Sequence, residues 1–187
     1  MDRLTLDTNI IRDWVWATGK SAERRYGGSA QARSRVLDLM NAMFQARDAG
    51  LCDFGVTTQV YTDYEKDVGE LPAHVQDLIG SYVPLASPSI SVFPMTFPFV
   101  LADVDEIQEI MAAVFPSSSP GERAYSKQRK DALQLYAHKV AMRDVFLTND
   151  KAILRARQLL AERQTITVMS PSEYVNSRGL RTSTGAA

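Results

Sequence analysis

Four aspartates stand at places in the chain where carboxylates could meet around a divalent cation: Asp7, Asp63, Asp131 and Asp150. Two of them follow short apolar runs, Leu4–Leu6 and Val145–Leu147, which are typical of buried strands. Several negative charges within a few ångströms repel one another strongly unless a cation neutralises them. Oxygen ligands without His or Cys favour Mg²⁺ or Mn²⁺ over zinc. The chemistry that uses such a site is phosphodiester hydrolysis, with a metal-activated water as the nucleophile.

The apolar periodicity predicts strands that alternate with helices. Strands are expected at Leu4–Leu6, Asp53–Thr57, Val145–Leu147 and Thr165–Met169, with a proline-broken strand around Ile90–Phe93. Helices are expected from Ile10 onward, at Ala30–Ala49, at Val60–Val68, at Pro72–Tyr82, at Val104–Phe115, at Glu122–Met142 and at Asp150–Ala161. This order predicts an α/β fold, a three-layer α/β/α sandwich with a central parallel sheet. Ligands of such sheets bind at the carboxyl ends of the strands, where Asp7 and Asp150 stand.

Helix capping is a simpler explanation for Asp7 and Asp150. An aspartate directly before a helix accepts hydrogen bonds from the first backbone N–H groups of that helix. Each residue taken alone therefore indicates little. An ordered set of four acids beside predicted strands is much harder to explain by capping.

Length and composition set the limits on what the chain can be. At 187 residues and 45% hydrophobic, the chain is expected to form one domain over residues 1–176, with a disordered tail at 177–187. Its 21 Lys and Arg balance 22 Asp and Glu, so a nucleic-acid partner would need a local basic patch. The single cysteine excludes a disulfide framework and a multi-cysteine zinc cluster. With no signal-like or membrane-spanning segment, a cytoplasmic protein that starts near Met1 is expected.

The segments that carry the acids resemble those of the PIN-domain family, and the resemblance covers nearly the whole chain. They are Leu4–Asn9, Val56–Thr58 followed by Asp63, Asp131–Leu133, Phe146–Asp150 and the closing run Ile166–Tyr174. PIN domains are α/β sandwiches with a central parallel sheet. Many are Mg²⁺- or Mn²⁺-dependent ribonucleases, among them VapC-like toxins. The resemblance therefore implies the same fold and an RNA-cleaving hydrolase.

The resemblance also implies roles for individual residues. Asp7, Asp131 and Asp150 would bind the metal ion, and Asn9 and Thr148 would support the site by hydrogen bonds. The basic residues that precede the third acid would suit a phosphate backbone, although a solvated helix face explains them equally well. These residues are Arg123, Lys127, Arg129 and Lys130.

The second acid departs from the family pattern. The family usually carries Glu on the helix after the second strand, and here that position is Asp63. Glu65 has the expected side chain but lies two residues on, a rotation of about 200° around a helix. Only one of the pair can face the site, and Asp63 is favoured.

The sequence thus predicts a Mg²⁺- or Mn²⁺-dependent endoribonuclease that acts on RNA, catalysed by Asp7, Asp63, Asp131 and Asp150. By resemblance it would be a toxin of a toxin–antitoxin pair, with an antitoxin protein as partner and a homodimer as its assembly. The alternative is a catalytically inactive PIN-fold module that binds RNA or a protein partner. The shortened second acid, Asp63, is the sequence feature that favours this alternative.

Overall fold

The computed structural model describes residues 1–19, 29–57, 60, 83–85, 88–89, 100–101 and 103–180. Several predictions lie outside these residues and are not addressed by the structure. They are the second-acid candidates Asp63 and Glu65, the helix at Val60–Val68 apart from Val60 itself, the helix at Pro72–Tyr82, the strand at Ile90–Phe93 and the tail beyond residue 180.

The centre of the molecule is a five-stranded sheet in the order β3-β2-β1-β6-β7, and all of its strand pairs are parallel. The strands are β1 (Asp2–Leu6), β2 (Cys52–Thr57), β3 (Val83–Leu85), β6 (Val145–Leu147) and β7 (Val168–Met169). The predicted α/β class with a parallel sheet is confirmed. Strand order reverses between β1 and β6, because β2 and β3 extend the sheet on one side and β6 and β7 on the other.

The proline-rich segment contributes a strand that the sequence analysis did not predict. Strand β3 lies at the edge of the sheet and pairs Pro84 with Val56. An edge position tolerates proline, because one side of the strand needs no partner. Two further short strands, β4 (Pro88–Ser89) and β5 (Val100–Leu101), pair with each other in parallel.

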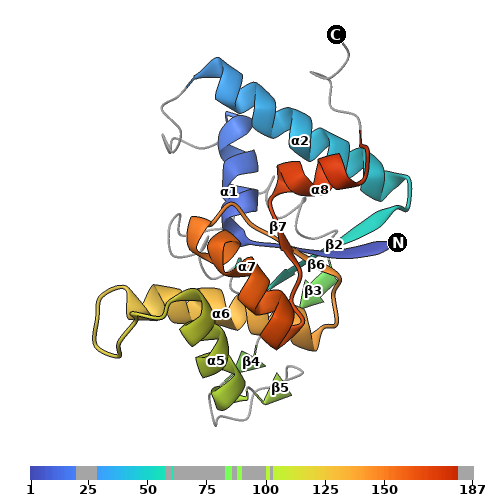
Figure 1. Cartoon of the computed structure of the whole chain (residues 1–187). Helices are drawn as coiled ribbons and strands as arrows, with labels where there is room; N and C mark the ends of the chain where they lie inside the picture. The colour runs from blue at the N-terminus through green and yellow to red at the C-terminus, as the bar shows by residue number, and fades with distance from the viewer. Residues whose placement is uncertain are drawn as a thin grey trace.

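Six helices within the described ranges pack on the two faces of the large sheet (Figure 1). Helices α1 (Thr8–Ala17), α2 (Ala30–Asp48) and α8 (Pro171–Ser177) share one hydrophobic core. Helices α5 (Val104–Val114), α6 (Tyr125–Val140) and α7 (Lys151–Gln164) share the other. This arrangement is compatible with a three-layer α/β/α fold.

Strand β6 shows why both faces are covered. Val145 and Leu147 enter the core formed with α1, α2 and α8, whereas Phe146 between them enters the core formed with α5, α6 and α7. Successive side chains of a strand point to opposite faces, so a continuous apolar run needs cover on both. The apolar strand runs in the sequence therefore follow from burial between two helical layers.

A row of polar contacts, which we call the polar seam, joins α6 and the turn after it to strand β1 and to Thr8 at the start of α1. Gln134 donates to the hydroxyl of Thr8 at 3.4 Å, and the His138 ring nitrogen Nδ1 lies 2.8 Å from the hydroxyl of Thr5. Beyond the helix, Arg143 donates to the carbonyl oxygen of Leu4 at 3.0 and 3.2 Å. The seam sets the position of α6 along β1, and so places the residues that α6 carries.

Gly55 in β2 lies against the side chain of Arg143, the last member of the polar seam. A Cβ atom built on Gly55 would lie 2.8 Å from Cζ of Arg143. The Arg143 side chain is only 4% exposed and also forms an ion pair with Asp53, so it has little freedom to move away. A side chain at position 55 would therefore collide with a buried and well-anchored guanidinium.

Helix α6 begins at Tyr125, three residues later than predicted, after a turn in which Tyr125 N–H bonds the carbonyl of Glu122. Helix α8 includes Ser177, and the N–H of Leu180 bonds the carbonyl of Val175. Across the described ranges, none of the helices combines the length and apolar character that crossing a bilayer requires.

Candidate active site

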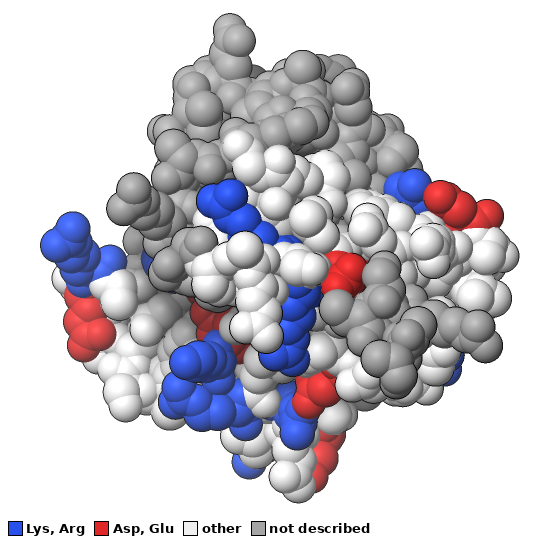
Figure 2. Space-filling view, turned by 90° about the horizontal axis from the view of Figure 1, so that it is seen from above, with Lys and Arg blue, Asp and Glu red and all other residues white. Residues whose placement is uncertain are grey.

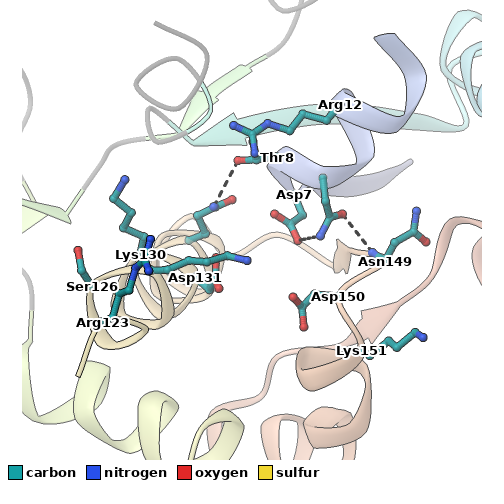
Figure 3. A pocket seen from close by; sticks show the side chains of 13 residues that line it. Asp7, Thr8, Arg12, Arg123, Ser126, Lys130, Asp131, Asn149, Asp150 and Lys151 are labelled. Atoms are coloured by element: carbon teal, nitrogen blue, oxygen red, sulfur yellow. Dashed lines mark hydrogen bonds between the residues drawn. The ribbon is translucent and has the colours of Figure 1, made fainter. Parts of the chain in front are cut away.

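A pocket of about 810 Å³ opens where strands β1 and β6 end (Figure 3). These neighbouring strands flank the point at which the strand order reverses, which is where open parallel sheets bind ligands. The pocket is lined by residues from the start of α1, from α6 and the turn before it, and from the start of α7. They are Asp7, Thr8, Asn9, Arg12, Arg123, Ser126, Lys127, Lys130, Asp131, Gln134, Asn149, Asp150 and Lys151.

Asp7 follows β1 and is 5% exposed. It occupies the N-cap position of α1, but its side chain makes no capping hydrogen bond to that helix. One carboxylate oxygen, Oδ2, instead accepts hydrogen bonds from the Asn9 amide and the Thr148 hydroxyl, each at 2.6 Å. The hydrogen bonds of this carboxylate thus come chiefly from the Asn9 and Thr148 side chains, so both predicted supporting residues contact it.

The surroundings of Asp7 oppose its ionisation. Its pKa is raised from 3.8 to about 6. Burial is the largest cause and the charge of Asp150 acts in the same direction, whereas the hydrogen bonds from Thr148 and from nearby backbone N–H groups lower the pKa. Removal from water is the largest of these effects, because it disfavours the charged form. A cation in the pocket would favour the ionised carboxylate.

Asp150 is both a helix cap and a member of the pocket. Its Oδ1 accepts from the backbone N–H groups of Ala152 and Ile153 at 2.7 and 3.3 Å, so Asp150 is the N-cap of α7. Its backbone N–H donates to the Thr148 hydroxyl at 2.9 Å. Because the cap uses Oδ1, capping leaves Oδ2 for another ligand.

A second layer of amides holds the strand ends together. Asn9 accepts from the backbone N–H of Asn149 at 3.1 Å, and its amide also donates to Thr148 at 3.2 Å. The Asn149 side chain donates to the buried carboxylate of Asp13 at 2.8 Å. Hydrogen bonds thus connect the ends of β1 and β6 on both sides of Asp7.

Asp131 lies across the pocket from the other two acids. In Figure 3, Asp7 and Asp150 stand on one side of the pocket. Asp131 and Lys130 on α6, and Arg123 in the turn before that helix, stand on the other. Within the described residues, no group of three or more His, Cys, Asp or Glu is arranged so that it could hold a metal ion. The three predicted metal ligands share one pocket without forming such a group.

Basic side chains surround the acids. Of the four predicted phosphate contacts, Arg123, Lys127 and Lys130 line the pocket and Arg129 does not. The structure adds Arg12 and Lys151, which the sequence analysis missed. Figure 2 shows Lys and Arg side chains gathered beside acidic ones on one face of the molecule.

Simple signals would have found both added cations. Lys151 directly follows Asp150, and Arg12 lies four residues after Thr8, one helical turn along α1. Gln134, also missed, lies on α6 three residues after Asp131 and therefore on a similar face of the helix.

Thr57 marks where β2 approaches the same edge of the sheet. Its hydroxyl is buried and has no hydrogen-bond partner in the described part of the chain. The candidates for the second acid, Asp63 and Glu65, follow this strand but lie outside the described residues.

No family model matches the chain, and no curated protein matches it significantly in sequence. The resemblance to PIN domains therefore remains a prediction that rests on the segments quoted above.

Proposed function

We propose that this chain is a Mg²⁺- or Mn²⁺-dependent endoribonuclease with a PIN-like fold. One observation supports the proposal above all others. Asp7, Asp131 and Asp150, which are far apart in sequence, line one pocket at the switch point of a parallel sheet, and five Lys and Arg line it with them. A nucleic-acid phosphodiester needs both groups, cations for its phosphates and carboxylates for a divalent ion.

The donor set of the pocket fits a hard divalent cation. Its acids offer only oxygen ligands, and none of the residues that line it is His or Cys. Mg²⁺ commonly binds through one or two carboxylates and fills its other positions with waters and substrate phosphates. Asp7 and Asp150, which are close enough for one charge to raise the pKa of the other, supply such a pair. When bound, the ion would supply charge neutralisation and an activated water for phosphodiester hydrolysis.

The protein residues have separate tasks in this proposal. Arg12, Arg123, Lys127, Lys130 and Lys151 hold the phosphates of the strand in the pocket. Asn9 and Thr148 fix the orientation of the Asp7 carboxylate through Oδ2, so that Oδ1 is turned to the ligand. Asp131 approaches from the opposite wall. Asp63 is proposed as the fourth acid, with Glu65 as its alternative.

A binding-only PIN-fold module is the second candidate, and one observation favours it. The described acids do not form a group of three that could hold a metal ion. Calorimetric titration with Mn²⁺ separates the two candidates. The nuclease proposal expects a site that takes the ion and is lost in Asp7→Asn, whereas a binding-only module takes up no ion in the pocket.

The proposed biological setting is a cytoplasmic toxin with an antitoxin partner and a dimeric assembly. It rests on the resemblance to VapC-like proteins alone. A small DNA-binding protein encoded by the adjacent reading frame would support it.

Cleavage of RNA by purified protein is the direct test. Wild type with Mg²⁺ or Mn²⁺ is expected to cut structured RNA, and chelation of the ion is expected to stop cleavage. Asp7→Asn should lose the activity, whereas Asp105→Asn, an exposed acid on α5 outside the pocket, should keep it. Undiminished cleavage by Asp7→Asn would refute the assignment.

A further inference from the structure

The amide oxygen of Gln134 is a buried acceptor without a hydrogen-bond partner in the described part of the chain. The residue is 2% exposed and lies in the wall of the pocket. Its amide nitrogen is held by the Thr8 hydroxyl, next to Asp7, at 3.4 Å. The oxygen is therefore the end of the side chain left to meet a ligand.

A buried acceptor of this kind requires a donor, because leaving it unpaired is unfavourable. The carboxylates of the pocket are acceptors when ionised and cannot fill this role. None of the basic side chains in the wall bonds to this oxygen. The donor is therefore expected to come from what the pocket binds, either a water on the ion or the nucleic acid itself, and in ion-free protein only the nucleic acid remains.

The chemistry of a phosphodiester narrows the choice of donor. The phosphate and ester oxygens of a strand only accept hydrogen bonds, and deoxyribose within a strand offers no donor. The bases carry donors in RNA and DNA alike, so they do not distinguish the two. Ribose adds the 2′-hydroxyl, the group by which a protein distinguishes RNA from DNA at a given position. Gln134 bonds Thr8, the residue after Asp7. It would therefore meet the sugar next to the phosphate that lies at the ion bound by Asp7.

We propose that Gln134 accepts a hydrogen bond from the 2′-hydroxyl of a bound ribonucleotide and thereby selects RNA over DNA. This inference rests on the proposed function, because it requires a nucleic-acid strand in the pocket. It assigns Gln134 a role in specificity that is distinct from the roles of the acids.

The first test changes the ligand and leaves the protein intact. Wild type in EDTA, so that no strand is cut, is titrated by fluorescence anisotropy into labelled single strands of one sequence. The strands are RNA, DNA and RNA with 2′-fluoro sugars, which lack the donor but keep the ribose pucker. One hydrogen bond to a neutral acceptor predicts about three- to tenfold tighter binding of RNA than of the 2′-fluoro strand.

The second test changes the protein. Gln134→Met keeps the length of the side chain and removes the acceptor, together with the long 3.4 Å hydrogen bond to Thr8. Its affinity for RNA should fall to that of wild type for the 2′-fluoro strand. Its affinity for DNA should not change. Gln158→Met on α7, whose side chain bonds Glu162 away from the pocket, is the matched control and should bind like wild type.

Three results would overturn the inference. They are equal binding of RNA and the 2′-fluoro strand by wild type, an equal loss of RNA and DNA binding in Gln134→Met, and no binding of any strand. If Gln134→Met does not fold, the comparison of strands still decides. Selective RNA binding without cleavage in Mg²⁺ would refute the nuclease proposal and leave the inference about Gln134 standing. Cleavage without a preference between the sugars would refute the inference about Gln134 and leave the nuclease proposal standing.

Discussion

Replacing Asp7 by Asn is expected to make the ion-free protein more stable at neutral pH. The substitution keeps an oxygen that can accept from Asn9 and Thr148, and it removes the buried negative charge. Asp7 would thus be required for the proposed reaction and would at the same time lower the stability of the ion-free protein.

The magnitude follows from the pKa of Asp7. Burial raises that pKa from 3.8 to about 6, and each pKa unit corresponds to about 1.4 kcal/mol, so the ionised carboxylate costs the fold about 3 kcal/mol. The folded state keeps its proton to a higher pH than the unfolded state. Stability is therefore lost as pH rises from about 4 to about 6, and the loss is complete above that range.

The net gain from the substitution is smaller than this cost. A neutral amide oxygen accepts hydrogen bonds about half as strongly as a carboxylate. We therefore expect Asp7→Asn to raise the free energy of unfolding by about 1–2 kcal/mol at pH 7.5. For a chain of this length, that corresponds to a rise in Tm of about 2–8 °C.

Thermal unfolding followed by circular dichroism checks this reasoning. In EDTA at pH 7.5 the variant should melt above wild type, whereas at pH 4 the two should melt together. Saturating Mn²⁺ should raise the Tm of wild type and leave that of the variant unchanged. Asp105→Asn serves as the control for the loss of one charge. A variant less stable than wild type at pH 7.5, or equally stabilised at both pH values, would show that burial of the charge is not the cause.

Three further outcomes are expected. Burial lowers the pKa of His138 from 6.5 to about 3, so the free energy of unfolding should fall as pH drops below 6.5, by up to about 1.4 kcal/mol per pH unit. Urea unfolding over a pH series should show a shallower dependence of this free energy on pH for His138→Asn. Gly55→Ala should destabilise by about 1–3 kcal/mol in denaturant unfolding, because its Cβ would meet Arg143, and unchanged stability would mean that the guanidinium moves freely. Thr148→Val should weaken Mn²⁺ binding about tenfold in calorimetry by freeing the Asp7 carboxylate from its partner, and an unaltered Kd would remove Thr148 from the supporting role.

Strands β1 and β6 and the meeting of Asp7 with Asp150 could be predicted from the sequence. Buried parallel strands leave continuous apolar runs, and parallel pairing brings their carboxyl ends to one edge. The exact role of Asp150 could not be predicted, because a sequence does not show which of the two carboxylate oxygens faces the helix and which faces the pocket. The structure assigns one carboxylate oxygen to the cap and leaves the other for the pocket.

The contribution of α6 to the pocket was harder to predict. Which face of α6 meets the site depends on how the helix docks on β1, and that depends on contacts between Gln134, His138 and residues more than 120 positions earlier. Such polar pairs have no periodicity that a sequence pattern reveals. Strand β3 was missed for a different reason, because proline masks a strand that lies at the edge of a sheet.

The polar seam has a consequence for how ions would be taken up. Sliding α6 by one turn, about 5.4 Å, would leave each of the seam's buried groups without its partner, so the helix has one stable register. The wall that carries Asp131 is therefore fixed before any ligand arrives. Burying the Asp7 carboxylate is then work done while the chain folds, and an arriving cation would offset that cost. The instability of the ion-free protein and its affinity for the ion would thus be two measures of one quantity.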